Sequence, residues 1–335
     1  MHDPAFPIHP RIVYSPHYNI RFYGLERLHP FDSRKYGRAY ALLKKQFPRT
    51  LERFTTPVPR PVSQEALLQL HTRAYLKDLK DRAYLARALE LPPLRRLPAF
   101  LTDFHVLRPM RWATAGTILA ARVALQHNLV FNLSGGYHHA APDHGEGFCI
   151  YNDIALAILS LRREQLIKDT DKILYVDTDA HQGNGVCHAF FTDPRVLIYD
   201  IYNRSIYPAH DAKAKRRIDC NVPIDINATD AEYLRHLEST LPPFMDAITR
   251  SSPIALAIYN AGTDPHRADP LGALALTDTG ILRRDQFVLN QLLSRQVPTL
   301  VLPSGGYTRQ SYQLIANTIS HCITTYTTPD TDSTN

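Results

Sequence analysis

The stretch ILYVDTDAH, residues 173–181, joins an unbroken apolar run to three closely spaced polar side chains. An apolar run this short predicts a strand that is buried on both faces, as in a parallel sheet. Four further runs are rich in apolar and β-branched residues: Leu129–Leu133, Val196–Ile201, Ile254–Tyr259 and Thr299–Leu302. Longer amphipathic stretches separate these runs. Strands that alternate with helices predict an α/β fold with a parallel sheet covered on both faces.

The amphipathic stretches between the runs predict the helices. The clearest are Ala113–His127, Asp153–Ile167, Asp230–Thr249 and Leu282–Arg295. We expect Asp230 to be the N-cap of the third helix, because its side chain can accept a hydrogen bond from the first turn. Upstream, Ser33–Gln46 and Ser63–Leu89 also carry helix formers, and Leu91–Met110 is rich in Pro and apolar residues.

The length and composition fit one large domain. The chain has 335 residues, of which 44% are apolar, enough for a sizeable core. We expect a single domain over residues 1–326 and a polar, disordered tail over 327–335. The sequence has neither a secretory signal pattern nor a stretch of about 18 apolar residues, so we expect no membrane span. Four scattered cysteines indicate a reducing compartment, and we expect a cytoplasmic protein.

The chain is basic, with a net charge of +6. Such a charge could attract nucleic acid or another acidic partner. The basic residues form no long block, however, and the densest run, residues 213–217, is interpreted as a solvated loop. We therefore expect no nucleic-acid partner.

Glycine and polar residues follow four of the predicted strands. Ligands of open parallel sheets bind beyond the carboxyl ends of the strands, so these loops form the candidate site. The loops are residues 134–139 (SGGYHH), 177–185 (DTDAHQGNG), 260–264 (NAGTD) and 303–307 (PSGGY). Glycines there allow tight turns and close approach of the backbone to a ligand.

The run from Asp177 through Asp179 to His181 indicates a metal site. A strand alternates its side chains between two faces, so these three could point the same way. Polar groups that share one face beside buried strands are costly without a positive partner. Two carboxylates and an imidazole suit zinc or a similar divalent ion.

A metal at this position would give the paired histidines and a tyrosine candidate catalytic roles. His138 and His139 become a candidate acid–base couple if the glycine-rich turn brings both side chains to one site. Tyr307 could be a buried tyrosine, or its phenol could donate to a developing oxyanion.

At this point the chain resembles the zinc-dependent histone deacetylases. The motifs that carry the resemblance are Gly135–Ala140, Gly147–Cys149, Asn152–Asp153, Asp177–His181 and Gly305–Tyr307. Motifs similar to the class IV branch, that of histone deacetylase-like amidohydrolases, are Tyr14–Asn19, Leu28–Asp32, His181–Gly185, Tyr202–Arg204 and Tyr259–Asp264. The resemblance spans residues 11 to 322.

This resemblance implies a fold and a reaction. The fold is the arginase–deacetylase fold, a central parallel sheet of about eight strands with helices on both faces. The reaction is hydrolysis of the ε-amide of acyl-lysine in a protein or peptide, by deacetylation or long-chain deacylation. The cofactor is one zinc ion per chain, with a potassium ion near the segment 177–181 as a structural companion.

The resemblance also assigns roles to residues of this sequence. The implied zinc ligands are Asp179, His181 and Asp264. The paired histidines are His138, supported by Asp177, and His139, supported by Asn184. Tyr307 is the implied oxyanion donor, and the walls of the acyl-lysine tunnel are Gly147, Phe148 and Tyr207.

Two departures affect the expected specificity. Asn184 stands where the most active histone deacetylases carry Asp, which should leave His139 less basic. No acidic residue that could grip the substrate backbone is identified near the rim of the tunnel. Since the net charge is also positive, we expect neutral or acidic sequence around the substrate lysine and long-chain acyl groups cleaved at least as well as acetyl.

Three other functions are rivals to this one. One is a small-molecule amidase of the same fold that acts on acetylated polyamines or similar amides. A dimanganese ureohydrolase would need additional bridging carboxylates, which the sequence around His181 lacks. A binding protein that kept only the fold should have lost a metal ligand or the oxyanion tyrosine. This chain has all three implied ligands and Tyr307. The sequence leaves the oligomeric state open.

Overall fold

An eight-stranded sheet forms the centre of the protein in a computed structural model that describes residues 8–20, 32–250 and 252–327. The strand order is β2-β1-β3-β8-β7-β4-β5-β6, and every neighbouring pair is parallel. The strands are β1 (Arg11–Tyr14), β2 (Thr55–Pro57), β3 (Leu129–Asn132), β4 (Lys172–Asp177), β5 (Val196–Asn203), β6 (Cys220–Ile224), β7 (Ile254–Asn260) and β8 (Thr299–Leu302). The predicted fold class is confirmed.

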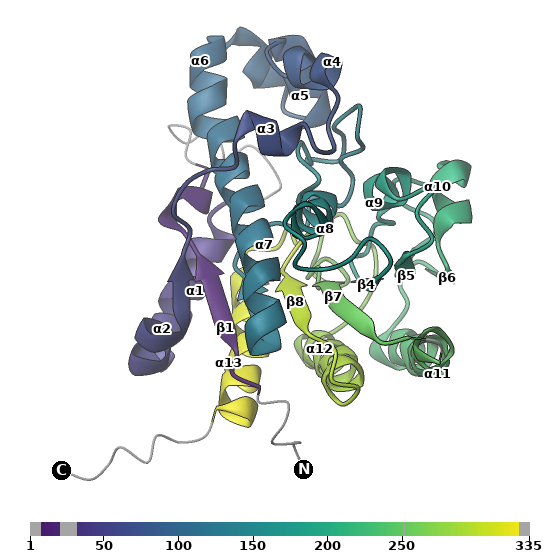
Figure 1. The fold of residues 1–335 in the computed structure, drawn as a ribbon. Coiled ribbons are helices and arrows are strands. Elements are labelled where there is room, and N and C mark those ends of the chain that lie inside the picture. The colour runs from purple at the N-terminus through teal and green to yellow at the C-terminus, as the bar shows by residue number, and fades with distance from the viewer. Residues whose placement is uncertain (1–7, 21–31, 251, 328–335) are drawn as a thin grey trace, which may run out of the picture.

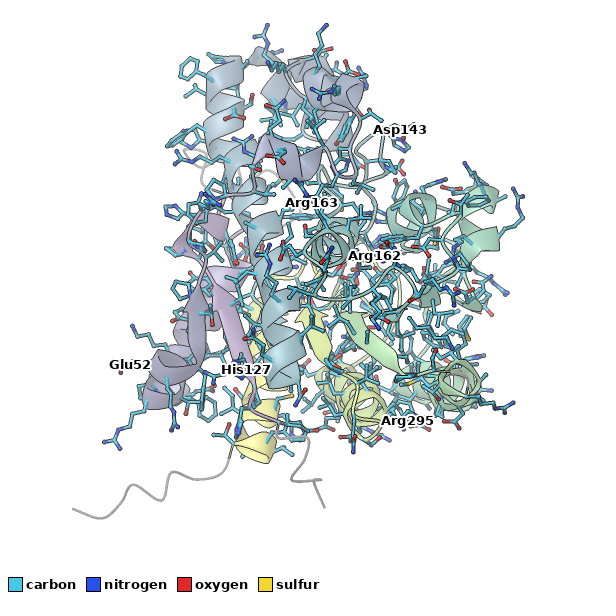
Figure 2. All side chains as sticks on the ribbon, viewed as in Figure 1. Glu52, His127, Asp143, Arg162, Arg163 and Arg295 are labelled. Atoms are coloured by element: carbon cyan, nitrogen blue, oxygen red, sulfur yellow. The ribbon has the colours of Figure 1, made fainter. Side chains whose placement is uncertain are left out.

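Helices cover both faces of this sheet (Figure 1). Side chains of β4 alternate between two cores, because successive residues of a strand point to opposite faces. Ile173 and Tyr175 pack with helices α7 and α8, and Leu174 and Val176 pack with α1, α11, α12 and α13. On the outer side of α8, Arg162 pairs with Asp193 (Figure 2).

The helices vary widely in length. They are α1 (Lys35–Gln46), α2 (Pro48–Phe54), α3 (Gln64–Leu67), α4 (Arg73–Asp78), α5 (Arg82–Ala88), α6 (Ala99–Thr102), α7 (Arg108–His127), α8 (Asp153–Arg163), α9 (Asn184–Ala189), α10 (Ala212–Arg217), α11 (Asp230–Thr249), α12 (Asp278–Leu293) and α13 (Ser311–Tyr326). Short 3₁₀ or π turns lie at Pro16–Tyr18, Pro92–Arg96 and Asp103–Leu107. The short helices α3 to α6 gather at one end of the molecule, at the top of Figure 1.

Two expectations about the helices need correction. Asp230 is the first residue of α11, and Thr229 is the N-cap, in a capping box with Glu232. The predicted helix over Ser63–Leu89 is divided into α3, α4 and α5, because Ser63, Thr72 and Asp81 each begin a new helix by capping it with the side chain.

The basic run at residues 213–217 was interpreted as a solvated loop, but it lies in helix α10. Arg217 is buried there, where its guanidinium donates to the carbonyl oxygens of Phe190 and Asp193 and pairs with Asp219. This arginine therefore holds neighbouring loops together and is not available to a ligand.

None of the described helices is long and apolar enough to cross a membrane. Within the sequence motifs, residues 28–31 lie outside the described residues, and so do residues 328–335 of the predicted tail.

Candidate metal centre and active site

The four polar loops predicted at strand ends lie side by side. They follow β3, β8, β7 and β4, which are four consecutive neighbours in the sheet. Because all these strands are parallel, their carboxyl ends meet at one edge. The sheet thus brings together segments that are distant in the chain, as the hydrogen bond from Ser304 Oγ to the Gly136 carbonyl, over 168 positions, illustrates.

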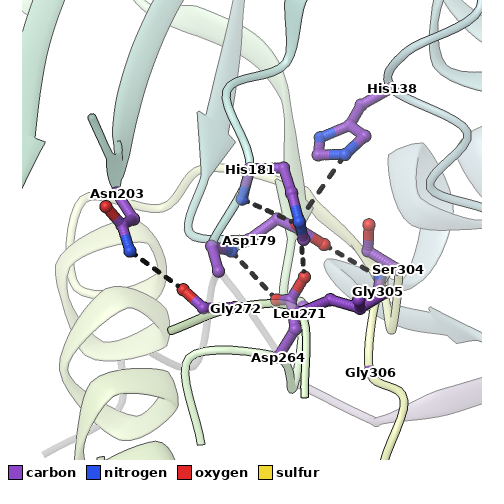
Figure 3. A network of polar contacts seen from close by, with 12 residues as sticks. His138, Asp179, His181, Asn203, Asp264, Leu271, Gly272, Ser304, Gly305 and Gly306 are labelled. Carbon is purple, nitrogen blue, oxygen red and sulfur yellow. Dashed lines mark hydrogen bonds and ion pairs between the residues drawn. The ribbon is translucent and has the colours of Figure 1, made fainter. Parts of the chain in front are cut away.

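Asp179, His181 and Asp264 form a buried cluster at this edge (Figure 3). One potential ligand atom from each lies within 4.8 Å of the others. The Nδ1 atom of His181 is 3.1 Å from Asp179 Oδ1 and 2.9 Å from Asp264 Oδ2. Backbone N–H groups hold the remaining oxygens: Gly305 N donates to Asp179 Oδ2, and Ala180 N donates to Asp264 Oδ1.

The residues around the cluster fit a bound cation. A Cβ atom at Gly305 would lie 2.4 Å from Asp179 Oδ2 and 2.5 Å from Asp264 Oδ2, so only glycine leaves both carboxylates room there. Burial, with the nearby Asp179, raises the pKa of Asp264 to about 7. Two buried carboxylates that face each other repel unless a positive charge lies between them. Two oxygen ligands and one imidazole nitrogen suit a divalent ion such as zinc.

Asp177 is not part of this cluster. Alternation along a strand predicts that Asp177 points the same way as Asp179 and His181, but strand β4 ends at Asp177 and the chain turns there. The Oδ2 atom of Asp177 is 2.8 Å from His138 Nδ1 and also accepts from the Tyr175 hydroxyl. The Oδ1 atom of Asp177 accepts from the Asn260 amide.

His138 and His139 lie with their rings 4.1 Å apart between centroids. Burial opposes a charge on His138, but Asp177 and Asp179 outweigh it and raise the pKa of His138 to about 9. Burial, with the neighbouring His138 and His181, lowers the pKa of His139 well below its usual value. The Nδ1 atom of His139 is 2.8 Å from Asn184 Oδ1. Neighbouring groups with opposite shifts are typical of an acid–base pair.

A cavity of about 80 Å³ reaches both histidines and Tyr307. Most of its lining is apolar or glycine, including Leu89, Leu91, Val106, Met110, Gly147 and Phe148. The ring of Tyr307 is 6.2 Å from that of His181 and 5.8 Å from that of Phe148. Burial and then the carboxylates of the metal cluster raise the pKa of Tyr307 well above its usual value, so its phenol keeps its proton.

Tyr207 lies beside this cavity and does not line it. Its ring is 5.0 Å from that of His139, and it lines an adjacent pocket of about 280 Å³ together with Gly147, Glu90 and Glu146. From the sequence, no acidic residue is identified at the rim of the tunnel, whereas Glu90 and Glu146 line this adjacent pocket. Neither glutamate belongs to a charged run, so the sequence gives no signal for them.

Other residues that shape the site were also missed. The ammonium of Lys35 is buried and donates to the carbonyl oxygens of Ser304, at 2.6 Å, and Gly306. Arg284 is buried in α12 and donates to the carbonyl oxygens of Thr178 and Gly262. These are contacts to backbone groups distant in the chain, for which no local sequence pattern exists.

Known proteins resemble this chain over most of its length. A family model described as "Histone deacetylase domain" matches residues 29–323. A "Histone deacetylase 2" of Arabidopsis thaliana is 40% identical over 314 residues, covering 92% of this chain and 78% of that protein. "Histone deacetylase B" of Dictyostelium discoideum is 31% identical, covering 74% and 59% respectively.

A solved structure has the same fold. The crystal structure of the HDA15 HD domain superposes with a TM-score of 0.72, covering 94% of this chain and 87% of that one at 22% identity. The parallel sheet with helices on both faces is therefore the arginase–deacetylase fold. Together with the match to the family model over residues 29–323, this places the chain in the histone deacetylase family.

Proposed function

We propose that this chain is a zinc-dependent hydrolase that removes acyl groups from the ε-amine of lysine, as a member of the class IV branch. One observation carries the proposal. A buried cluster of two carboxylates and one imidazole lies at the same strand ends as two histidines of opposite pKa shift and a protonated tyrosine. These are the groups that hydrolysis of an amide requires.

Asp179, His181 and Asp264 would hold the zinc ion. When bound, zinc supplies polarisation of an acyl carbonyl and a lowered pKa of water. The chain's own residues supply the proton transfers. His139, neutral at physiological pH, accepts a proton from the attacking water and then gives one to the leaving amine. His138, held by Asp177 at 2.8 Å, contributes a positive charge, and Tyr307 donates a hydrogen bond to the oxyanion.

The cavity supports an acyl group longer than acetyl. Its lining is mostly apolar or glycine, including Leu89, Leu91, Val106 and Met110, which suits a hydrocarbon chain longer than the methyl group of acetyl. Each methylene buried in an apolar lining gains about 0.8 kcal/mol. We therefore propose that long-chain acyl-lysine is cleaved at least as well as acetyl-lysine.

The pocket beside the cavity changes the proposal about sequence context. Neutral or acidic flanks are expected from the net charge of +6 and from the lack of an identified acidic residue at the rim, and Glu90 and Glu146 weaken the second reason. The same two carboxylates favour a second candidate function, hydrolysis of an acetylated polyamine, because they could bind a second amino group. Tyr84 and Arg87 line this pocket as well.

Two ancillary proposals have specific support. Asp200 is buried beside β4, and its Oδ1 atom has no hydrogen-bond partner among the described residues, which favours a potassium ion close to the segment 177–181. All four cysteines are free thiols in the structure, which favours a reducing compartment such as the cytoplasm.

The test is a substrate panel with one peptide carrying acetyl-, octanoyl- or myristoyl-lysine, in parallel with acetylputrescine and acetylspermidine. We expect the protein to remove the acyl group from the peptide lysine, and a chelator to abolish this activity. The kcat/KM for octanoyl-lysine should be at least equal to that for acetyl-lysine. Faster turnover of the polyamines would favour the second candidate. If no amide is hydrolysed by zinc-loaded protein, both proposals are wrong.

A further inference from the structure

The side-chain amide of Asn184 lies between His139 and two carboxylates. On one side, Asn184 Oδ1 is 2.8 Å from His139 Nδ1. On the other side, Asn184 Nδ2 is 2.5 Å from Glu146 Oε1 and 3.4 Å from Asp211 Oδ2. The amide is buried, and Glu146 is half-buried beside it.

The chemistry of these partners fixes how the amide is oriented. An ionised carboxylate can only accept hydrogen bonds, so the NH₂ group of Asn184 must face Glu146 and Asp211. The Glu146 side chain is ionised at neutral pH, because the nearby His144, Tyr207 and Asn184 outweigh burial and lower its pKa. The carbonyl oxygen of Asn184 must then face His139.

This orientation decides the tautomer of His139. An amide oxygen can only accept, so His139 Nδ1 carries the proton and Nε2 keeps its lone pair. In the flipped orientation the NH₂ group would face Nδ1, and the proton would move to Nε2. A histidine in the wrong tautomer cannot accept a proton at the nitrogen that faces the substrate. In other hydrolases a wrong histidine tautomer lowers kcat strongly.

We propose that Glu146 is a positioning residue that locks the Asn184 amide and thereby sets the tautomer in which His139 acts as a base. Of the two carboxylates, Glu146 makes the shorter contact with Asn184 Nδ2. Asp211 is in addition engaged by His188 at 2.7 Å and by the first turn of α10. Glu146 also lines the pocket beside the cavity together with Tyr207, so through Asn184 it links that pocket to His139. The inference rests on the proposed function, in which His139 is the general base.

The test compares Glu146→Gln with wild type, both zinc-loaded. Gln has nearly the same shape, but its amide can donate as well as accept, so it permits both orientations of Asn184. We expect kcat to fall about tenfold while KM changes less than about twofold. Two-bond ¹H–¹⁵N correlations of ¹⁵N-histidine protein, with His139 assigned by its loss in His139→Gln, should show both tautomers in the variant and only Nδ1–H in wild type.

Glu52→Gln is the matched control. Glu52 is an exposed carboxylate on helix α2 and lies at the outer edge of the molecule (Figure 2). It should keep kcat within about twofold. Glu146→Asp, which remains acceptor-only, should keep the Nδ1–H tautomer and more activity than Glu146→Gln, so this order can be tested even if one variant folds poorly.

Three results would overturn the inference: full activity in Glu146→Gln, a fall in kcat with an unchanged His139 tautomer, or an equal loss in Glu52→Gln. The tautomer measurement needs no substrate. If wild-type protein hydrolyses no amide, the proposed function fails, and the spectra still decide whether Glu146 sets the tautomer.

Discussion

Tyr307 is the residue whose chemistry is easiest to isolate, because Phe removes its hydroxyl and keeps its ring. Its phenol stays protonated through burial and the nearby carboxylates. We expect Tyr307→Phe to lower kcat by ~10²–10³ with KM and zinc content nearly unchanged, as for loss of one oxyanion donor. Steady-state kinetics and metal analysis measure this. Turnover within a few-fold of wild type would make Tyr307 a packing residue.

Asn184 is explained by its acidic neighbours as well as by His139. Asp at this position would place a third carboxylate beside Glu146 and Asp211. We expect Asn184→Asp to lower the free energy of unfolding by about 1–3 kcal/mol, because a hydrogen bond becomes a like-charge contact. Adding Glu146→Gln should restore most of this loss. Additive effects of the two substitutions in denaturant unfolding would show that the side chains do not interact.

Single residues also mark the limit of sequence reasoning. The strand-end loops predicted the region of the metal cluster, but alternation along a regular strand wrongly grouped Asp177 with Asp179 and His181. The strand ends at Asp177, so alternation no longer applies beyond it. Glu146 and Asn184 lie 38 positions apart and meet only because two loops fold against each other. A contact of that kind leaves no local pattern.

At the scale of elements, helix α12 fixes the two loops that carry the metal cluster. Arg284 donates to the carbonyl oxygens of Thr178, after β4, and Gly262, after β7, and pairs with Asp285 at 2.7 Å. Asp285 in turn accepts from Tyr259 and Thr318. One buried guanidinium thus sets the spacing between the loop that contains Asp179 and the loop that contains Asp264.

Replacing this arginine should affect both stability and metal binding. Arg284→Met removes a donor from the buried carbonyls of Thr178 and Gly262 and removes the positive partner of the buried Asp285 carboxylate, which should cost about 3–5 kcal/mol of unfolding free energy. Thermal unfolding and zinc titration measure the two effects. Arg283→Met, on the exposed side of the same helix, is the control and should change neither. Equal behaviour of the two variants would contradict the role given to Arg284.

The strands that the sequence failed to predict are those at or near the edges of the sheet. The five predicted strands form the central part, where burial on both faces produces continuous apolar runs. Strands β2 and β6 are the two edges, and both contain a proline, Pro57 and Pro223. Proline is tolerated at edges because one side of the strand needs no ladder hydrogen bonds. Short edge strands therefore look like loops in sequence.

At the scale of the whole molecule, the metal cluster is a buried, negatively charged site that exists only when the complete sheet has formed. Asp179 and Asp264 come from loops after different strands, and two backbone N–H groups and Arg284 hold these loops in place. The free protein must bear the repulsion between the two carboxylates, which appears as the raised pKa of Asp264, about 7, caused mainly by burial and then by Asp179. Metal binding should therefore contribute to the stability of the whole fold.

We expect purified protein to hold about one zinc ion per chain and its Tm to fall when a chelator removes the metal. Asp264→Ala should lose most of the metal, because two of three ligands remain, and its Tm should no longer respond to zinc. Asp225→Ala, which removes an exposed carboxylate paired with Arg204, is the control and should respond like wild type. Metal analysis and thermal unfolding across free zinc concentrations decide the matter. Two ions per chain, or unchanged metal content in Asp264→Ala, would exclude a single site built on this cluster, since a complete site elsewhere would then hold the ion.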